Sequence, residues 1–115
     1  MADTIKSLGD YLRAKFGAEV TYNINPVVSS VGTTATEVAR HNPRRMGLTI
    51  VNLSSNILYV APDNNVSATR SVLLPSNGGG LSLSADDDFI LPMVNWFAVA
   101  SGASSAVFVV EVVLV

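Results

Sequence analysis

The residues that could carry out chemistry in this chain are few and lie far apart in the sequence. Nucleophilic catalysis by a Ser-His-Asp arrangement requires a positioned histidine, and the only histidine is His41, directly before Asn42-Pro43. A single histidine at such a turn is usually exposed to solvent instead of being held against a catalytic partner. The sequence therefore offers no catalytic constellation, and we expect the protein not to be an enzyme.

The acidic residues also lack the spacing of a metal site. Asp86, Asp87 and Asp88 are consecutive. Consecutive side chains of an extended segment point to alternate sides, so three of them converge on one ion only in a special loop. A solvated turn is the simpler interpretation. The chain has no cysteine, which excludes disulfides and thiolate metal sites, and we expect neither a metal nor a cofactor.

Two further patterns invite a ligand but favour ordinary structural roles. The segment Ser76-Asn77-Gly78-Gly79-Gly80 is glycine-rich like a phosphate-binding loop, yet no lysine follows it and no helical pattern begins there. Four aromatic residues could offer their faces to a sugar, namely Trp96, Tyr22, Tyr59 and Phe97, although aromatic side chains in strands more often belong to the core. We interpret the first as a turn and keep the second as a basis for an alternative function.

The composition raises the question of what covers the surface. At 115 residues the chain forms one ordinary domain. Hydrophobic residues make up 49% and charged residues only 14%, against about 25% charged residues in typical soluble domains. Either Ser, Thr and Asn replace charge on the surface, or neighbouring subunits cover much of it, because contact surfaces are depleted in Lys, Glu and Asp. Both interpretations remain open at this point.

The charge and hydropathy of the chain argue against nucleic acid and membrane as partners. The net charge is −2 and the isoelectric point is about 5.1, so no overall basic surface for nucleic acid exists. The start of the chain lacks the basic and apolar regions of a secretory signal. The apolar run at 106–110, even extended to residue 115, is far shorter than the roughly 18 to 20 residues that a membrane helix needs.

Residues 1–17 form a predicted helical arm. Asp3 is a candidate N-cap, Gly17 suits the left-handed residue that ends a helix, and apolar residues recur at helical spacing: Ile5, Leu8, Leu12 and Phe16. A helix this short is marginal in water on its own. Its apolar stripe must therefore dock, either on its own domain or on another subunit, and we favour another subunit.

Residues 18–115 form a predicted all-β domain. Apolar and polar residues alternate there in about eight short runs separated by turn signals, which is typical of an antiparallel sandwich or a barrel. The runs at 48–53 and 57–60 flank Ser54-Ser55-Asn56 and predict a β-hairpin. Both of its strands carry apolar residues on both faces, so we expect this hairpin at the centre of the domain.

The last strand predicts a contact surface. Its alternate residues form two apolar faces, one with Phe108, Val110, Val112 and Leu114, and one with Val107, Val109, Glu111, Val113 and Val115. One such face belongs to the core of any sandwich. The second would promote aggregation if it were left in water. We expect the face with Val107, Val109, Val113 and Val115 to be covered by a partner chain or by the helix.

The β region resembles a group of small virion proteins of tailed bacteriophages, over roughly residues 36–115. The resemblance rests on Asn42-Pro43-Arg44-Arg45, the runs at 48–54 and 58–60, Leu73-Leu74-Pro75, the glycine-rich turn before Leu81, and the segment 96–101 ahead of the valine-rich last strand. It implies a jelly-roll-like β-sandwich that assembles with itself, often as a homotrimer. It also implies that Arg44 and Arg45 brace the fold or an interface.

The function implied by this resemblance is structural. We expect a homo-oligomeric decoration (cement) protein that is made in the host cytoplasm, binds the major capsid protein or other virion proteins, and stabilises the capsid surface. Large apolar contact areas would supply the binding energy. The alternative is a tail or fibre module that binds a host surface glycan through an exposed aromatic platform.

Overall fold

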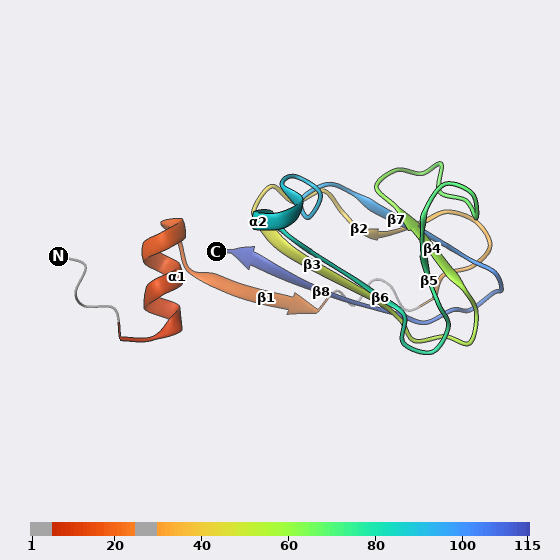
Figure 1. The fold of residues 1–115 in the computed structure, drawn as a ribbon, viewed down its shortest axis with the longest axis horizontal. Coiled ribbons are helices and arrows are strands. Elements are labelled where there is room, and N and C mark those ends of the chain that lie inside the picture. The colour runs from red at the N-terminus through yellow and green to blue at the C-terminus, as the bar shows by residue number, and fades with distance from the viewer. Residues whose placement is uncertain (1–5, 25–29) are drawn as a thin grey trace.

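The computed structural model describes residues 6–24 and 30–115 and forms a sandwich of two four-stranded antiparallel sheets (Figure 1). One sheet has the order β1-β8-β3-β6 and the other the order β2-β7-β4-β5. The strands are β1 (Val20–Ile24), β2 (Thr36–Ala39), β3 (Arg45–Asn52), β4 (Leu58–Ala61), β5 (Val72–Leu74), β6 (Gly80–Ser84), β7 (Trp96–Ala100) and β8 (Val107–Leu114). The predicted all-β sandwich with one short N-terminal helix is confirmed.

The strand order is that of a jelly roll. Each strand is followed in sequence by a strand of the other sheet, except that β4 and β5 are neighbours in one sheet. The first and last strands, β1 and β8, lie side by side, so the two ends of the β domain meet in one sheet. Eight antiparallel strands in two sheets with such crossings are the jelly-roll arrangement, as the resemblance implied.

The predicted hairpin at 48–60 is wrong, because its two strands belong to different sheets. β3 pairs with β6 and β8, whereas β4 pairs with β5 and β7. The connection is a crossover organised by the fully buried side chain of Asn52. Its Nδ2 donates to the carbonyls of Asn56 (2.7 Å) and Leu74 (3.1 Å), and its Oδ1 accepts from the backbone N–H of Ser54 (3.0 Å). These bonds turn the chain out of β3 and bind the end of β5 to the same point.

The core lies between the sheets and is almost entirely aliphatic. Alternate residues of the central strands point inward, as in any sheet with one buried face: Leu48 and Ile50 of β3, Leu58 and Val60 of β4, Trp96, Ala98 and Ala100 of β7, and Val107 and Val109 of β8. The one tryptophan, Trp96, donates its indole N–H to the carbonyl of Leu91 (2.8 Å). The packing of side chains from both sheets therefore holds the layers together.

The face of β8 that we predicted to contact a partner is the core face. Val107, Val109 and Val113 are buried inside the sandwich, so the prediction that they lie in an interface is wrong. Val115, beyond the end of β8, is exposed. The face that points outward carries Phe108 and Val112.

Two short helices complete the fold of the residues that the structure describes. Helix α1 (Leu8–Phe16) begins after Ser7, whose side chain accepts from the N–H of Asp10, and ends at Gly17, whose φ of 72° is the predicted left-handed conformation. It therefore starts later than the predicted helix, and Asp3 and Ile5 lie outside the described residues. The acidic turn is a single helical turn, α2 (Ala85–Asp88), capped by Ser84.

Candidate interaction surfaces

The outer face of the β1-β8-β3-β6 sheet is an apolar surface open to solvent. Residues opposite one another in an antiparallel pair point to the same side of the sheet. Tyr22 and Ile24 of β1 lie opposite Val112 and Val110 of β8. On the other side of β8, Phe108 lies opposite Val51 of β3. We call this surface the outer face; it comprises Val20, Tyr22, Ile24, Val51, Phe108, Val110, Val112 and Leu114.

The outer face is exposed where β1 and β8 meet and becomes polar toward β6. The side chain of Tyr22 is 66% exposed and that of Val112 is 38% exposed. Toward the other edge, the Thr49 hydroxyl is hydrogen-bonded to that of Ser82 (3.1 Å). Contiguous exposed apolar patches of this kind mark interaction sites. The charge-poor composition therefore has a local explanation, an apolar sheet face centred on β1 and β8.

Helix α1 presents a second apolar surface. It lies beyond one end of the sandwich (Figure 1) and none of its nine residues is buried. Leu8 is 71% exposed, Tyr11 is exposed, and Leu12 and Phe16 are only half-buried. Arg13 and Asp10 form an exposed ion pair (3.6 Å) away from this stripe. The predicted helical contact residues Leu8, Leu12 and Phe16 are thus available to a partner, and they make no core of their own.

The ends of the β domain are fastened together next to α1. Arg44 donates from Nε to the carbonyl of Leu114 (2.9 Å) and from Nη2 to that of Val115 (2.6 Å). The N–H of Val115 donates to the carbonyl of Glu19 (2.7 Å), just before β1. Arg44 was predicted to brace the fold or an interface, and in the described chain it holds the end of β8.

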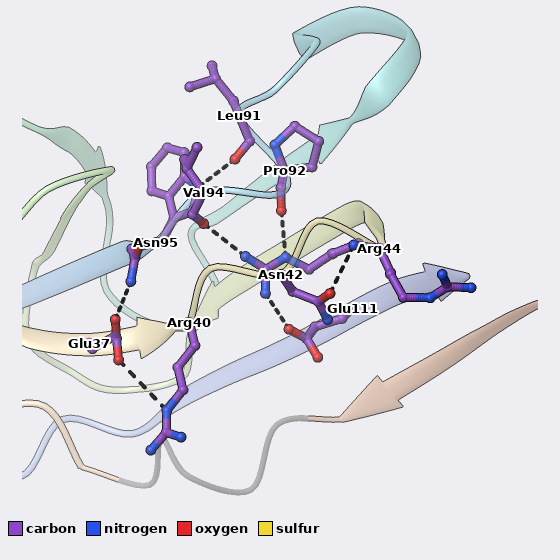
Figure 2. A network of polar contacts seen from close by, with 11 residues as sticks. Glu37, Arg40, Asn42, Arg44, Leu91, Pro92, Val94, Asn95 and Glu111 are labelled. Carbon is purple, nitrogen blue, oxygen red and sulfur yellow. Dashed lines mark hydrogen bonds and ion pairs between the residues drawn. The ribbon is translucent and has the colours of Figure 1, made fainter. Parts of the chain in front are cut away.

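Arg45 forms the buried polar centre of the same end of the sandwich. Its side chain is nearly inaccessible, and its guanidinium donates to Glu111 Oε1 (2.5 Å), the carbonyl of Pro92 (2.5 Å) and the carbonyl of Val94 (2.9 Å). Figure 2 shows these three acceptors converging from β8 and from the segment before β7. Arg45 therefore braces the fold, one of the two roles implied by the resemblance, and it is too deeply buried to contact a partner.

An open cleft of about 650 Å³ lies between the edge strands β1 and β2. Its lining includes Glu37, Arg40 and His41, together with the Arg45–Glu111 ion pair. Glu37 accepts from Asn95 Nδ2 (2.5 Å) and pairs with Arg40 (3.8 Å) (Figure 2). Among residues 6–24 and 30–115, neither a serine nor a cysteine lines the cleft beside His41.

A third exposed apolar feature is the loop after α2. Phe89 is 79% exposed and its φ of 57° is unusual for a residue with a bulky side chain. Ile90 beside it is also exposed. In the sequence, Phe89, Ile90 and Leu91 follow three aspartates, a pattern that does not reveal the exposure of these side chains.

The comparisons with known proteins add no relative. No family model, curated protein or solved structure matches the chain. Its function must therefore be argued from its own surfaces.

Residues 6–24 and 30–115 show no metal site. Within them, no three His, Cys, Asp or Glu side chains lie close enough together to bind a metal ion. In the same residues, no helix is long and apolar enough to cross a membrane. The aromatic platform that a glycan-binding module would need cannot include Trp96, which is buried, and Tyr59 is half-buried.

Among residues 6–24 and 30–115, the clear pKa shifts belong to an exposed ion pair in the loop that connects β4 to β5. Arg70 donates from Nη1 and Nη2 to the two carboxylate oxygens of Asp63 (2.5 and 2.7 Å). This hydrogen bonding holds the pKa of Asp63 below its ordinary value and raises the pKa of Arg70. Since both groups are exposed, the pair fixes the loop and adds little to stability.

Proposed function

We propose that this protein is a structural virion subunit that assembles with itself, as a homotrimer, and decorates the capsid surface of a tailed bacteriophage. The partner on the particle is the major capsid protein or another virion protein. The protein is made in the host cytoplasm and stabilises the shell through non-covalent contacts. It carries out no reaction in this role.

The observation that carries the proposal is the apolar outer face. A contiguous apolar sheet face with Tyr22, Ile24, Phe108 and Val112 exposed is unfavourable in a protein that acts alone in water. Covering it contributes about 25 cal/mol per Å² of apolar surface. A subunit that is present in many copies can convert such contacts into mechanical stability of a shell. The phage itself is suggested by the resemblance of residues 36–115 to small jelly-roll virion proteins.

The alternative, a tail or fibre module that binds a host glycan, has less support. It requires an exposed aromatic platform, but of the four aromatic residues considered for it Trp96 is buried, and Tyr59 and Phe97 are half-buried. Tyr22 is exposed, but it lies among aliphatic side chains that offer no hydrogen bonds to a sugar. The outer face suits a protein partner better.

Electron cryomicroscopy of the particle that carries the protein tests the proposal. We expect density for a jelly-roll sandwich at regular positions on the outside of the capsid. Particles without the protein should lose their contents at a lower temperature, as measured by dye access to the packaged DNA. Density confined to the tail would contradict the proposal. So would the absence of the protein from purified, unmodified particles.

A further inference from the structure

We propose that helix α1 of one copy of the protein lies on the outer face of β1 and β8 of a neighbouring copy. This inference rests on the proposed homo-oligomer and identifies the surfaces that build it. The outer face and the stripe of α1 are two apolar surfaces of one chain, and neither is covered within the described residues. Because both surfaces are apolar, each would be removed from water by contact with the other.

The dimensions of the two surfaces match. A helix of the nine residues of α1 is about 14 Å long and, with side chains, about 10 Å wide. The five residues of β1 extend about 16 Å, and β1 with β8 and β3 spans about 10 Å between the outer strand axes. One copy of α1 is therefore long and wide enough to cover the exposed part of the outer face. In this arrangement the stripe of Leu8, Leu12 and Phe16 contacts the outer face along the length of the helix.

The connection between α1 and β1 directs the helix away from its own sheet. Gly17 donates its N–H to the carbonyl of Arg13 (2.9 Å), which fixes the end of the helix. The carbonyl of Glu19 accepts from Val115 (2.7 Å), which fixes the start of β1. Only Ala18 lies between these two anchors. The helix consequently projects beyond the sandwich (Figure 1), where another copy can receive it.

The charges of the two parts favour the same contact. Residues 1–17 contain three basic and two acidic residues, whereas residues 18–115 contain four basic and seven acidic residues. The arm is therefore positive and the β domain negative. This attraction steers the arm toward the domain of another copy and opposes contacts between two domains or two arms.

The small size of a single contact explains why the exchange must be repeated. One helix on one sheet face buries less than the roughly 800 Å² per partner of a stable interface. If each copy gives one helix and receives one, every copy buries both of its apolar surfaces. Such head-to-tail contacts close into a ring when the rotation permits, and three copies form the proposed trimer.

Disulfide cross-linking tests this arrangement without interference, because the chain has no cysteine. Full-length Leu12→Cys and Val112→Cys chains carrying different tags are co-expressed, purified through both tags and oxidised. We expect a disulfide-linked heterodimer. The matched control replaces Val112→Cys by Val72→Cys on β5, a valine of similar exposure (43% against 38%) in the other sheet. The yield of this control should be at least about tenfold lower, because Val72 lies in the other sheet and the proposed contact brings only Val112 within disulfide distance of Leu12.

Three outcomes would overturn the proposal. The first is that Leu12→Cys cross-links to Val72→Cys as well as it does to Val112→Cys. The second is that no disulfide forms between Leu12→Cys and Val112→Cys. The third is that a dilute chain carrying both Leu12→Cys and Val112→Cys forms an intramolecular disulfide. Sedimentation of the unmodified protein separates the causes. A homo-oligomer without cross-linking refutes only the helix exchange, whereas a monomer also refutes the proposed homo-oligomeric function.

Discussion

Replacing Arg45 by methionine removes the buried guanidinium and tests its role in the fold. Arg45 is 3% exposed and donates to Glu111 and to two main-chain carbonyls. In the Arg45→Met variant the carboxylate of Glu111 and both carbonyls lose their donor. Breaking a buried ion pair in this way costs about 3–5 kcal/mol. A domain of this size is stable by only about 5–15 kcal/mol, so the loss removes a large part of its stability.

Urea unfolding followed by the fluorescence of Trp96 measures this loss, because Trp96 is the only tryptophan and lies in the core. With a denaturant slope of about 2 kcal/mol per M, the midpoint should fall by about 2 M at the same protein concentration. The Arg44→Met control removes an exposed arginine and should cost less than about 1.5 kcal/mol. A second variant, Arg45→Met with Glu111→Leu, should recover part of the loss, because no charge is left unpaired.

A small effect would refute this reasoning. If the midpoint of Arg45→Met fell by no more than that of Arg44→Met, Arg45 would not brace the fold. If adding Glu111→Leu made the loss larger, the unpaired carboxylate would not be its cause.

Three further predictions concern other residues. Asn52→Ala should lower the free energy of unfolding in urea by about 2–3 kcal/mol, because it leaves buried carbonyls without a donor; an unchanged midpoint would mean that Asn52 does not hold the crossover. The pKa of Asp63, followed by NMR of its carboxyl carbon, should lie below 3.8 and return toward that value in Arg70→Gln. Since the folded pKa is lowered, the pair's small contribution is present above the unfolded pKa and is lost as the pH falls through the folded pKa. Phe89→Gly should leave the thermal midpoint unchanged or raise it, because glycine accepts a φ of 57° and the lost side chain is exposed; a lower midpoint would contradict this.

The sequence predicts the sandwich and the end of the helix because both depend on local signals. Alternation of apolar and polar residues predicts strands. Gly17 predicts the end of the helix, because glycine adopts the left-handed conformation without the steric penalty that a side chain would bring. The hairpin fails for the opposite reason. Ser54-Ser55-Asn56 suits a hairpin turn and a crossover equally well, and the choice depends on bonds from Asn52 to the distant carbonyls of Leu74 and Pro75.

The faces of β8 could not be assigned from its own residues. Both faces are apolar, and the face with Glu111, which we predicted to be covered by a partner chain or by the helix, is the inner one. Glu111 lies inside because it meets Arg45, which precedes it by 66 positions. The apolar and polar pattern of the strand itself cannot predict an ion pair with a residue so far away in the sequence. The exposed surface therefore had to be found from the pairing of β1 with β8.

The measurement that tests the central claim most directly is the mass of the protein in solution, determined by sedimentation at micromolar concentration. The unmodified protein should be a homo-oligomer. Val112→Asp places a charge in the outer face without touching the core and should yield a folded monomer, since a buried unpaired charge is costly. Val72→Asp on the other sheet should leave the oligomer intact. A monomeric unmodified protein, or an oligomer that tolerates Val112→Asp, would contradict the account.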